Sequence, residues 1–286
     1  MLTTAEVQEI DRANESGLPP VVFVHGLWLL RGSWDRWRTL FAEHGYAPVA
    51  PGWPDDPETV AEATANPGVF AGKGVGAVTA HYREAIGRLR REPVVVGHSF
   101  GGLITQKLAG LGLARASVAI DPGPFRGVLP LPLSSLRAAF PVLGNPLNRG
   151  RSVRLSLAQF RYAFANAVPE EEAERLYREY HVPGSGIPLF QAATANVWPW
   201  AETAVDTRNP ERGPLLIISG EHDNTVPWAI ANASYRKQRR NPSVTEIVEI
   251  PGRGHSLVID SGWREVAERA LAFLREHDPD RAGNRL

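Results

Sequence analysis

Short apolar runs alternate along the chain with segments whose apolar residues recur every three or four positions. The runs consist mainly of Val, Ile, Leu, Ala and Phe, as is typical of strands in a parallel sheet that is buried on both faces. We predict six strands of this kind, at 21–24, 46–50, 94–96, 117–121, 215–220 and 244–250. The segments between them, such as 75–89, have helical spacing. The alternation predicts an α/β fold with a mostly parallel central sheet of about six strands, flanked by helices.

One long segment breaks this alternation. Residues 123–206 are rich in Pro, Leu and aromatic residues, and we predict helices near 134–140, 156–167 and 170–180 but no clear strand. Because open α/β sheets bind ligands at their carboxyl edge, we expect a helical lid inserted over that edge. The predicted organisation is a helical leader at 1–18, an α/β core at 19–122 and 207–277, the lid at 123–206, and a tail at 278–286.

A serine stands where a strand meets a helix. The run at 94–96 leads into residues 97–101, Gly-His-Ser-Phe-Gly, and the apolar residues at 103–111 have helical spacing. This pattern is typical of a nucleophile elbow, in which a strained turn exposes the serine. The glycines on either side leave room where the backbone passes close to its neighbours. We interpret Ser99 as a nucleophile, with an inert serine in a glycine-rich turn as the alternative.

A serine hydroxyl becomes a good nucleophile only when a base removes its proton and an acid orients that base. His255 follows the strand predicted at 244–250 and is the candidate base. Asp223 follows the preceding predicted strand and is the candidate acid, with Asp121, also at a strand end, as its rival. The order of nucleophile, acid and histidine along the chain differs from that of the two other common serine triads.

These three segments, in this order, resemble the α/β-hydrolase superfamily, in its serine-hydrolase branch with a helical lid. The resemblance extends from about residue 21 to residue 277. It implies the fold described above, and it implies that the backbone amides of Leu27 and Phe100 form an oxyanion hole. Leu27 follows His25 and Gly26, and Phe100 follows the nucleophile.

The predicted function is that of a serine esterase. It would cleave a carboxylic ester of an apolar small molecule, or a related thioester or lactone, through an acyl-enzyme with no cofactor. The apolar character of 123–206 favours such a substrate, and Trp28, Trp198 and Trp228 are candidate substrate-binding residues. The alternatives are a cofactor-free perhydrolase, a hydroxynitrile-lyase-like enzyme, and a non-catalytic ligand-binding protein of the same fold.

The composition excludes several other classes of function. The formal net charge is zero, so no overall field would recruit nucleic acid. The absence of cysteine excludes thiolate catalysis, and the histidines show no metal-ligand spacing, so no metal site is expected. No apolar run approaches the roughly 20 residues of a membrane span, and the leader lacks the apolar core of a signal peptide. These features predict a cytoplasmic protein that acts on a small molecule, and they leave its oligomeric state open.

Overall fold

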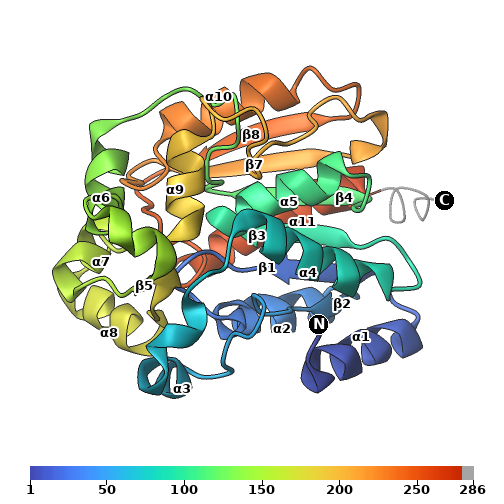
Figure 1. The fold of residues 1–286 in the computed structure, drawn as a ribbon. Coiled ribbons are helices and arrows are strands. Elements are labelled where there is room, and N and C mark those ends of the chain that lie inside the picture. Colours follow the sequence, from blue (N-terminus) through green and yellow to red (C-terminus); the bar gives the residue numbers. More distant parts are fainter. Residues whose placement is uncertain (279–286) are drawn as a thin grey trace.

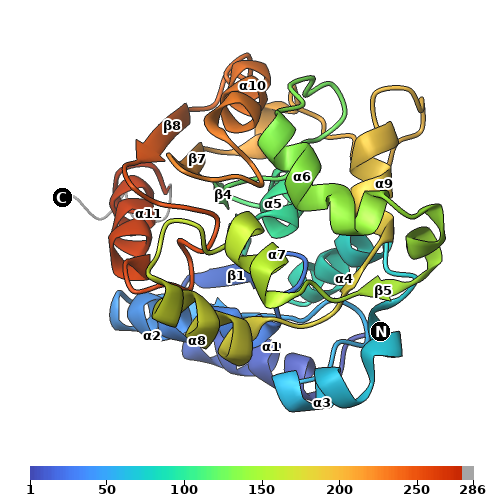
Figure 2. The same ribbon diagram turned by 90° about the vertical axis from the view of Figure 1, so that its left-hand side faces the viewer.

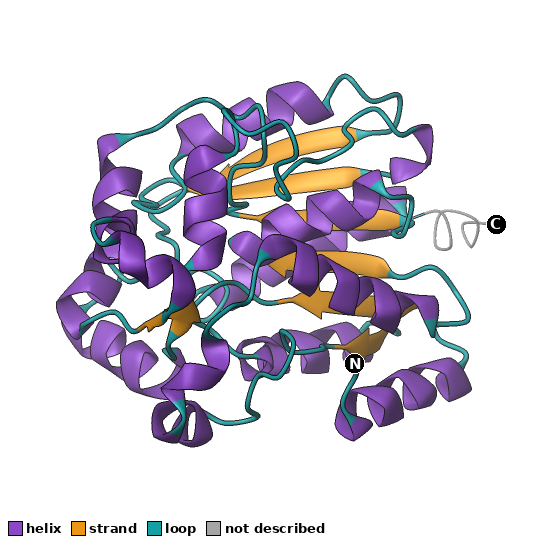
Figure 3. Ribbon diagram, viewed as in Figure 1, coloured by secondary structure: helices purple, strands orange, loops and turns teal. Residues whose placement is uncertain are grey.

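The strands form one parallel sheet in a computed structural model, which describes residues 1–278. Their spatial order is β2-β1-β3-β4-β7-β8, and Figures 1 and 3 show them side by side. The strands are β1 Pro20–Val24, β2 Ala47–Val49, β3 Val94–His98, β4 Ala116–Ile120, β7 Leu215–Gly220 and β8 Thr245–Ile250. Every residue of β1, β3, β4 and β7 is buried. The predicted parallel α/β sheet is therefore confirmed.

Helices cover both faces of this sheet, which explains why its strands are apolar on both sides. In Figure 2, α4, α5 and α10 lie on one face, whereas α2 and α11 lie on the other. The helices outside the segment between β4 and β7 are α1 Thr4–Ser16, α2 Asp35–Glu43, α3 Val60–Ala65, α4 Val75–Gly87, α5 Phe100–Gly110, α10 Trp228–Gln238 and α11 Trp263–His277. None of the helices among residues 1–278 is both long enough and apolar enough to span a membrane.

The segment between β4 and β7 is mainly helical and lies at the end of the sheet to which the strand arrows point (Figures 1 and 3). Its helices are α6 Leu133–Leu143, α7 Leu157–Ala163, α8 Glu170–Tyr180 and α9 Ile187–Thr194. Helix α9 was not predicted, because its eight residues are too few to show a clear helical spacing of apolar positions. The sequence shows no clear strand in this segment, but the structure contains one short strand pair. This is a two-residue antiparallel pair, β5 Ser152–Val153 with β6 Gly184–Ser185, which is too short to leave a periodic signal.

Helix α1 begins at a capping box. The Thr3 hydroxyl accepts a hydrogen bond from the Glu6 amide, and the Glu6 carboxylate accepts one from the Thr3 amide. Ile10 and Ala13 are the buried apolar residues of the helix, which packs beside β2 at the edge of the sheet. Of the predicted tail, only Asp278 lies within the described residues, and it is buried in an ion pair with Arg115. The rest of the tail, 279–286, lies outside them.

Candidate active site

Ser99 occupies a strained turn between β3 and α5. Its backbone has φ of +57° and ψ of −122°, a conformation that residues with a Cβ atom rarely adopt. A Cβ atom at Gly97 would collide with the Gly101 backbone, and one at Gly101 would collide with the Val24 carbonyl oxygen. Both glycines are therefore needed for the close approach of β1, β3 and α5 that creates this turn.

The structure brings Ser99, His255 and Asp223 together in one hydrogen-bonded line. Ser99 Oγ lies 2.9 Å from His255 Nε2, and His255 Nδ1 lies 2.6 Å from Asp223 Oδ2. Asp223 Oδ1 also accepts hydrogen bonds from the backbone amides of Thr225, at 2.6 Å, and Val226, at 2.8 Å. These amides hold the carboxylate in place and stabilise its charge. The three side chains follow β3, β8 and β7, whose carboxyl ends meet at one edge of the sheet.

Asp121, the rival acid, lies at the end of β4 and is turned toward the same histidine. Its Oδ2 is 3.9 Å from His255 Nδ1, whereas its Oδ1 accepts a hydrogen bond from the Gly220 amide at 2.8 Å. Burial raises the pKa of Asp121 well above its usual range, and the negative charge of Asp223 raises it further. Of the two carboxyl groups, Asp223 is therefore the one hydrogen-bonded to His255.

The backbone amides of Leu27 and Phe100, the residue after Ser99, donate no hydrogen bond to another residue between 1 and 278. The loop that carries Leu27 lies against the serine, because a Cβ atom at Gly26 would stand 2.9 Å from the Ser99 Cβ. His25 holds this loop: its Nε2 accepts a hydrogen bond from the Trp53 amide at 3.2 Å, and its ring stacks on that of Trp53. Two free amides beside a serine can bind a developing oxyanion.

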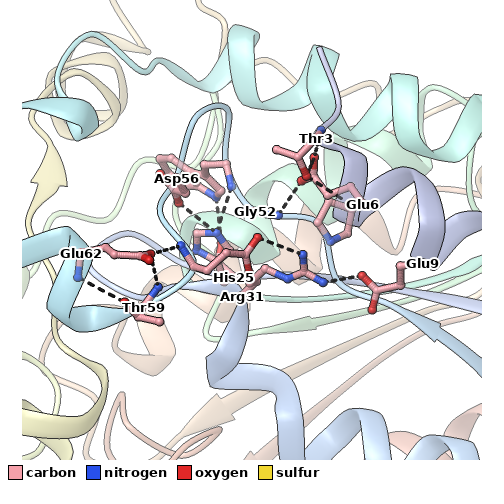
Figure 4. Close-up of polar contacts among 12 residues, drawn as sticks. Thr3, Glu6, Glu9, His25, Arg31, Gly52, Asp56, Thr59 and Glu62 are labelled. Carbon is pink, nitrogen blue, oxygen red and sulfur yellow. Dashed lines mark hydrogen bonds and ion pairs between the residues drawn. The ribbon is translucent and has the colours of Figure 1, made fainter. Parts of the chain in front are cut away.

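A network of buried charges joins α1 to the segments behind this loop (Figure 4). Glu6 accepts a hydrogen bond from the Gly52 amide and pairs with His81, each at 3.0 Å. Burial by itself would raise the pKa of Glu6, but the hydrogen bonds from His81 and Thr3 lower it to about 2. Glu9 pairs with Arg31, which follows the loop directly, at 2.5 Å. Helix α1 is thus anchored by ion pairs as well as by apolar contact.

The two histidines next to the candidate site residues in sequence have different positions. His98 is buried, and its Nε2 donates a hydrogen bond to the backbone oxygen of His255 at 2.9 Å. Burial lowers the pKa of His98 well below its usual range, and its proximity to His255 lowers it further, so the ring is neutral. His98 therefore positions the backbone of His255. The side chain of His222, by contrast, is exposed.

His98, Asp121 and His255 place possible ligand atoms within 4.8 Å of one another. Both ring nitrogens of His255 are already in hydrogen bonds, with Ser99 and Asp223. A cation would have to replace one of these bonds, so the cluster is better suited to proton transfer than to metal binding.

Residues 21–269 match the model of the Alpha/beta hydrolase family. The chain belongs to this family. A search of curated proteins found no significant match, but many solved structures resemble this alpha/beta hydrolase in fold.

A monoacylglycerol lipase of Paleococcus ferrophilus is one of these structures, with 20% identity, a TM-score of 0.60, and coverage of 90% of this chain and 96% of the lipase. A pyrethroid hydrolase from Sphingobium faniae has 19% identity, a TM-score of 0.60, and coverage of 89% and 96%. A thioesterase domain from the curacin biosynthetic pathway has 15% identity, a TM-score of 0.55, and coverage of 90% and 92%. Identities this low establish a shared fold.

A cavity of about 160 Å³ opens beside Ser99 in this alpha/beta hydrolase. No residue that lines it carries a formal charge. The larger apolar side chains in its wall come from the loop after β1 and from α5, α6, α9 and α10, and include Trp28, Phe100, Leu136, Leu189 and Ile230. The cavity therefore favours an uncharged, apolar group next to the serine.

The predicted substrate-binding tryptophans do not all reach this cavity. Trp28 lines it, but Trp198 and Trp228 are not among its lining residues. Trp198 is 58% exposed and packs edge-on against Trp200. A further residue of the site, not indicated by the sequence, is Phe164, whose ring contacts the His255 ring edge-on at 4.8 Å between centroids. No local pattern marks Phe164, because only the packing of α7 against the loop after β8 creates this contact.

Proposed function

We propose that this alpha/beta hydrolase cleaves a carboxylic ester of an apolar small molecule, or a related thioester or lactone, through an acyl-enzyme on Ser99. The observation that carries this proposal is the hydrogen-bonded line from Ser99 Oγ through the His255 ring to Asp223, with distances of 2.9 and 2.6 Å. A serine, a histidine and a carboxylate in this arrangement form the machinery of acyl transfer.

In the acylation step, His255 Nε2 takes the proton of Ser99 as Oγ attacks the substrate carbonyl carbon. The negative charge that develops on the carbonyl oxygen is stabilised by the amides of Leu27 and Phe100. Asp223 stabilises the imidazolium that forms and keeps the proton on Nδ1. His255 then gives its Nε2 proton to the leaving group, and the acyl group remains on Ser99.

Water completes the reaction. His255 removes a proton from a water molecule as its oxygen attacks the acyl carbon, and then returns that proton to Ser99 as the acid product leaves. Every proton thus passes through one nitrogen, His255 Nε2, which points at the serine. Apart from substrate and water, the steps use only groups that the chain supplies.

The uncharged cavity supports an apolar substrate. In this proposal α6 and α9 act as a lid, because both contribute residues to the cavity wall and belong to the segment at the end of the sheet to which the strands point (Figure 1). Two proteins of similar fold are named a lipase and a thioesterase, which agrees with attack at an ester or thioester carbonyl. Each methylene that the cavity buries adds about 0.8 kcal/mol of binding free energy.

Covalent labelling tests the proposal most directly. Intact-mass analysis after treatment with a fluorophosphonate should show one adduct on the native protein and none on Ser99→Ala. A panel of p-nitrophenyl esters with acyl chains of increasing length should then show turnover by the native protein only. A folded native protein that forms no adduct and hydrolyses none of these esters would overturn the proposal and favour the ligand-binding alternative.

A further inference from the structure

Strand β4 places a second carboxyl group inside the candidate site. It lies in the sheet between β3, which leads to Ser99, and β7, which leads to Asp223. Asp121 follows β4, is fully buried, and has a backbone φ of +40°. A non-glycine residue in this conformation is strained. The side chain of Asp121 is thus positioned by a backbone conformation that is itself unfavourable.

The surroundings of the two carboxyl groups differ. Asp223 is bonded to two backbone amides and to His255, which together stabilise a negative charge. Asp121 receives one amide hydrogen bond, from Gly220 to Oδ1. Its Oδ2 is buried without a hydrogen-bond partner, although it lies within 4 Å of the same His255 Nδ1 that Asp223 contacts. Asp121 therefore has little to stabilise a charge of its own.

Two buried carboxylates beside one imidazole cannot both be ionised at low cost. The titratable groups that face Asp121 are Asp223, His255 and His98. His98 is neutral, so it offers no compensating charge. Among residues 1–278, no Lys or Arg forms an ion pair with either carboxyl group. One proton shared by the pair removes the repulsion.

We propose that Asp121 is a neutral carboxylic acid that directs its proton at the Asp223 carboxylate and holds the pair at one negative charge. Asp121 is then a positioning residue for the triad. When His255 becomes an imidazolium, it faces one net negative charge, so the two carboxyl groups and the imidazolium together are neutral while the negative charge develops on the substrate oxygen. The effect on rate rests on the proposed function, whereas the protonation state of Asp121 does not.

The same geometry gives Asp121 a second role. If Asp223 loses its charge, the reason for Asp121 to stay protonated disappears. Asp121 then ionises and becomes the one carboxylate within 4 Å of His255 Nδ1. A small rotation of the ring or of the Asp121 side chain would close this distance to a hydrogen bond, so Asp121 serves as a reserve acid.

Infrared difference spectroscopy tests the protonation without any need for activity. The carbonyl stretch of a protonated carboxyl group is resolved from that of a carboxylate. At neutral pH, we expect such a band in the native protein and in Ser99→Ala, and its loss in Asp121→Asn. Asp260→Asn is the matched control, because Asp260 is equally buried but paired with Arg253. Absence of an Asp121-dependent band in the native protein would overturn the proposal, whether or not the protein hydrolyses esters.

Kinetics then test positioning. Asparagine reproduces the shape and the neutral hydrogen-bond donor of protonated Asp121, so Asp121→Asn should lower kcat by less than about fivefold. Asp121→Val leaves buried polar groups unpaired and should lower kcat by about tenfold or more. Circular dichroism shows whether each variant folds. Since the native pair carries one ionisable proton, the alkaline limb of the rate profile should change in Asp121→Asn. Equal losses in Asp121→Asn and Asp121→Val would show that a charged Asp121 is needed, against the proposal.

A double-mutant cycle tests the reserve role. Asp223→Asn should lower kcat by about 10² to 10⁴, as expected when the imidazole takes the wrong tautomer. Adding Asp121→Asn to that variant should cost a further tenfold or more, compared with less than about fivefold in the native background. The same small effect of Asp121→Asn in both backgrounds would refute the reserve role. A native protein without hydrolytic activity would instead refute the proposed function and leave the infrared result standing.

Discussion

Gly26 lies so close to Ser99 that a Cβ atom at position 26 would stand 2.9 Å from the Ser99 Cβ and 3.0 Å from the His98 carbonyl oxygen. Non-bonded carbon atoms prefer separations of about 3.5–4.0 Å. The loop that carries Leu27 and the turn at Ser99 are therefore in close contact, and the position of the Leu27 amide depends on the absence of a side chain at residue 26.

Gly26→Ala should push this loop away from Ser99. Loss of one oxyanion donor typically lowers kcat by about 10²–10³, and we expect a fall of that size with a smaller change in KM. Steady-state kinetics on an ester that the native protein hydrolyses would measure it. Gly87→Ala is the control, because a Cβ atom there meets nothing within 4 Å. If a folded Gly26→Ala variant kept the native kcat, the Leu27 amide would be excluded as an oxyanion donor.

Glu9→Ala should destabilise the protein without touching the site. Glu9 is 4% exposed and pairs with Arg31 and Arg38. Removal of one partner of a buried ion pair costs about 3–5 kcal/mol, because the other charge stays buried and unpaired. Urea denaturation would measure the free energy of unfolding. Glu15→Ala, on the exposed side of the same helix, should stay within about 0.5 kcal/mol of the native value.

Glu6 makes part of the stability of the folded protein dependent on pH. Its pKa is lowered from 4.5 to about 2 in the folded protein, so folding favours the charged carboxylate. The stabilisation is fully present above the unfolded pKa and is lost as pH falls through 4.5 toward 2. We expect Glu6→Gln to lower the free energy of unfolding at pH 7 by about 1–3 kcal/mol. The difference between the two proteins should shrink as pH falls below 4.5. A constant difference down to pH 3 would contradict this assignment.

Ala192→Phe should restrict the accepted substrates to those with shorter chains. Ala192 lies on α9 and lines the cavity beside Ser99, so a phenyl group there would occupy space that an acyl or alcohol chain needs. Each methylene kept out of the cavity loses about 0.8 kcal/mol of binding free energy, or about fourfold in kcat/KM, so long-chain esters should lose far more than acetate esters. Trp198→Ala, outside the cavity wall, should leave this preference unchanged. Equal losses on short and long esters in Ala192→Phe would place the substrate elsewhere.

The local sequence determined most of the framework. The apolar runs mark the strands of the sheet, because strands covered on both faces need apolar residues at nearly every position. The residues at 97–101 mark the strained turn at Ser99, since a Cβ atom at Gly97 or Gly101 would collide with neighbouring backbone. The Thr3 and Glu6 pair marks the start of α1, because a capping box is formed by residues three positions apart. Each of these features depends on neighbours in the chain.

Only the tertiary structure determined those features of the site that involve residues far apart in the chain. Asp121 and Asp223 both follow strands, and only the placement of His255 gives Asp223 the 2.6 Å contact and Asp121 the 3.9 Å one. Likewise, Trp28 lines the cavity and Trp198 does not, because their positions depend on how the segment between β4 and β7 packs over the sheet. Residue type limits the chemistry of a side chain, but its distance to a partner is set by the packing of the whole fold.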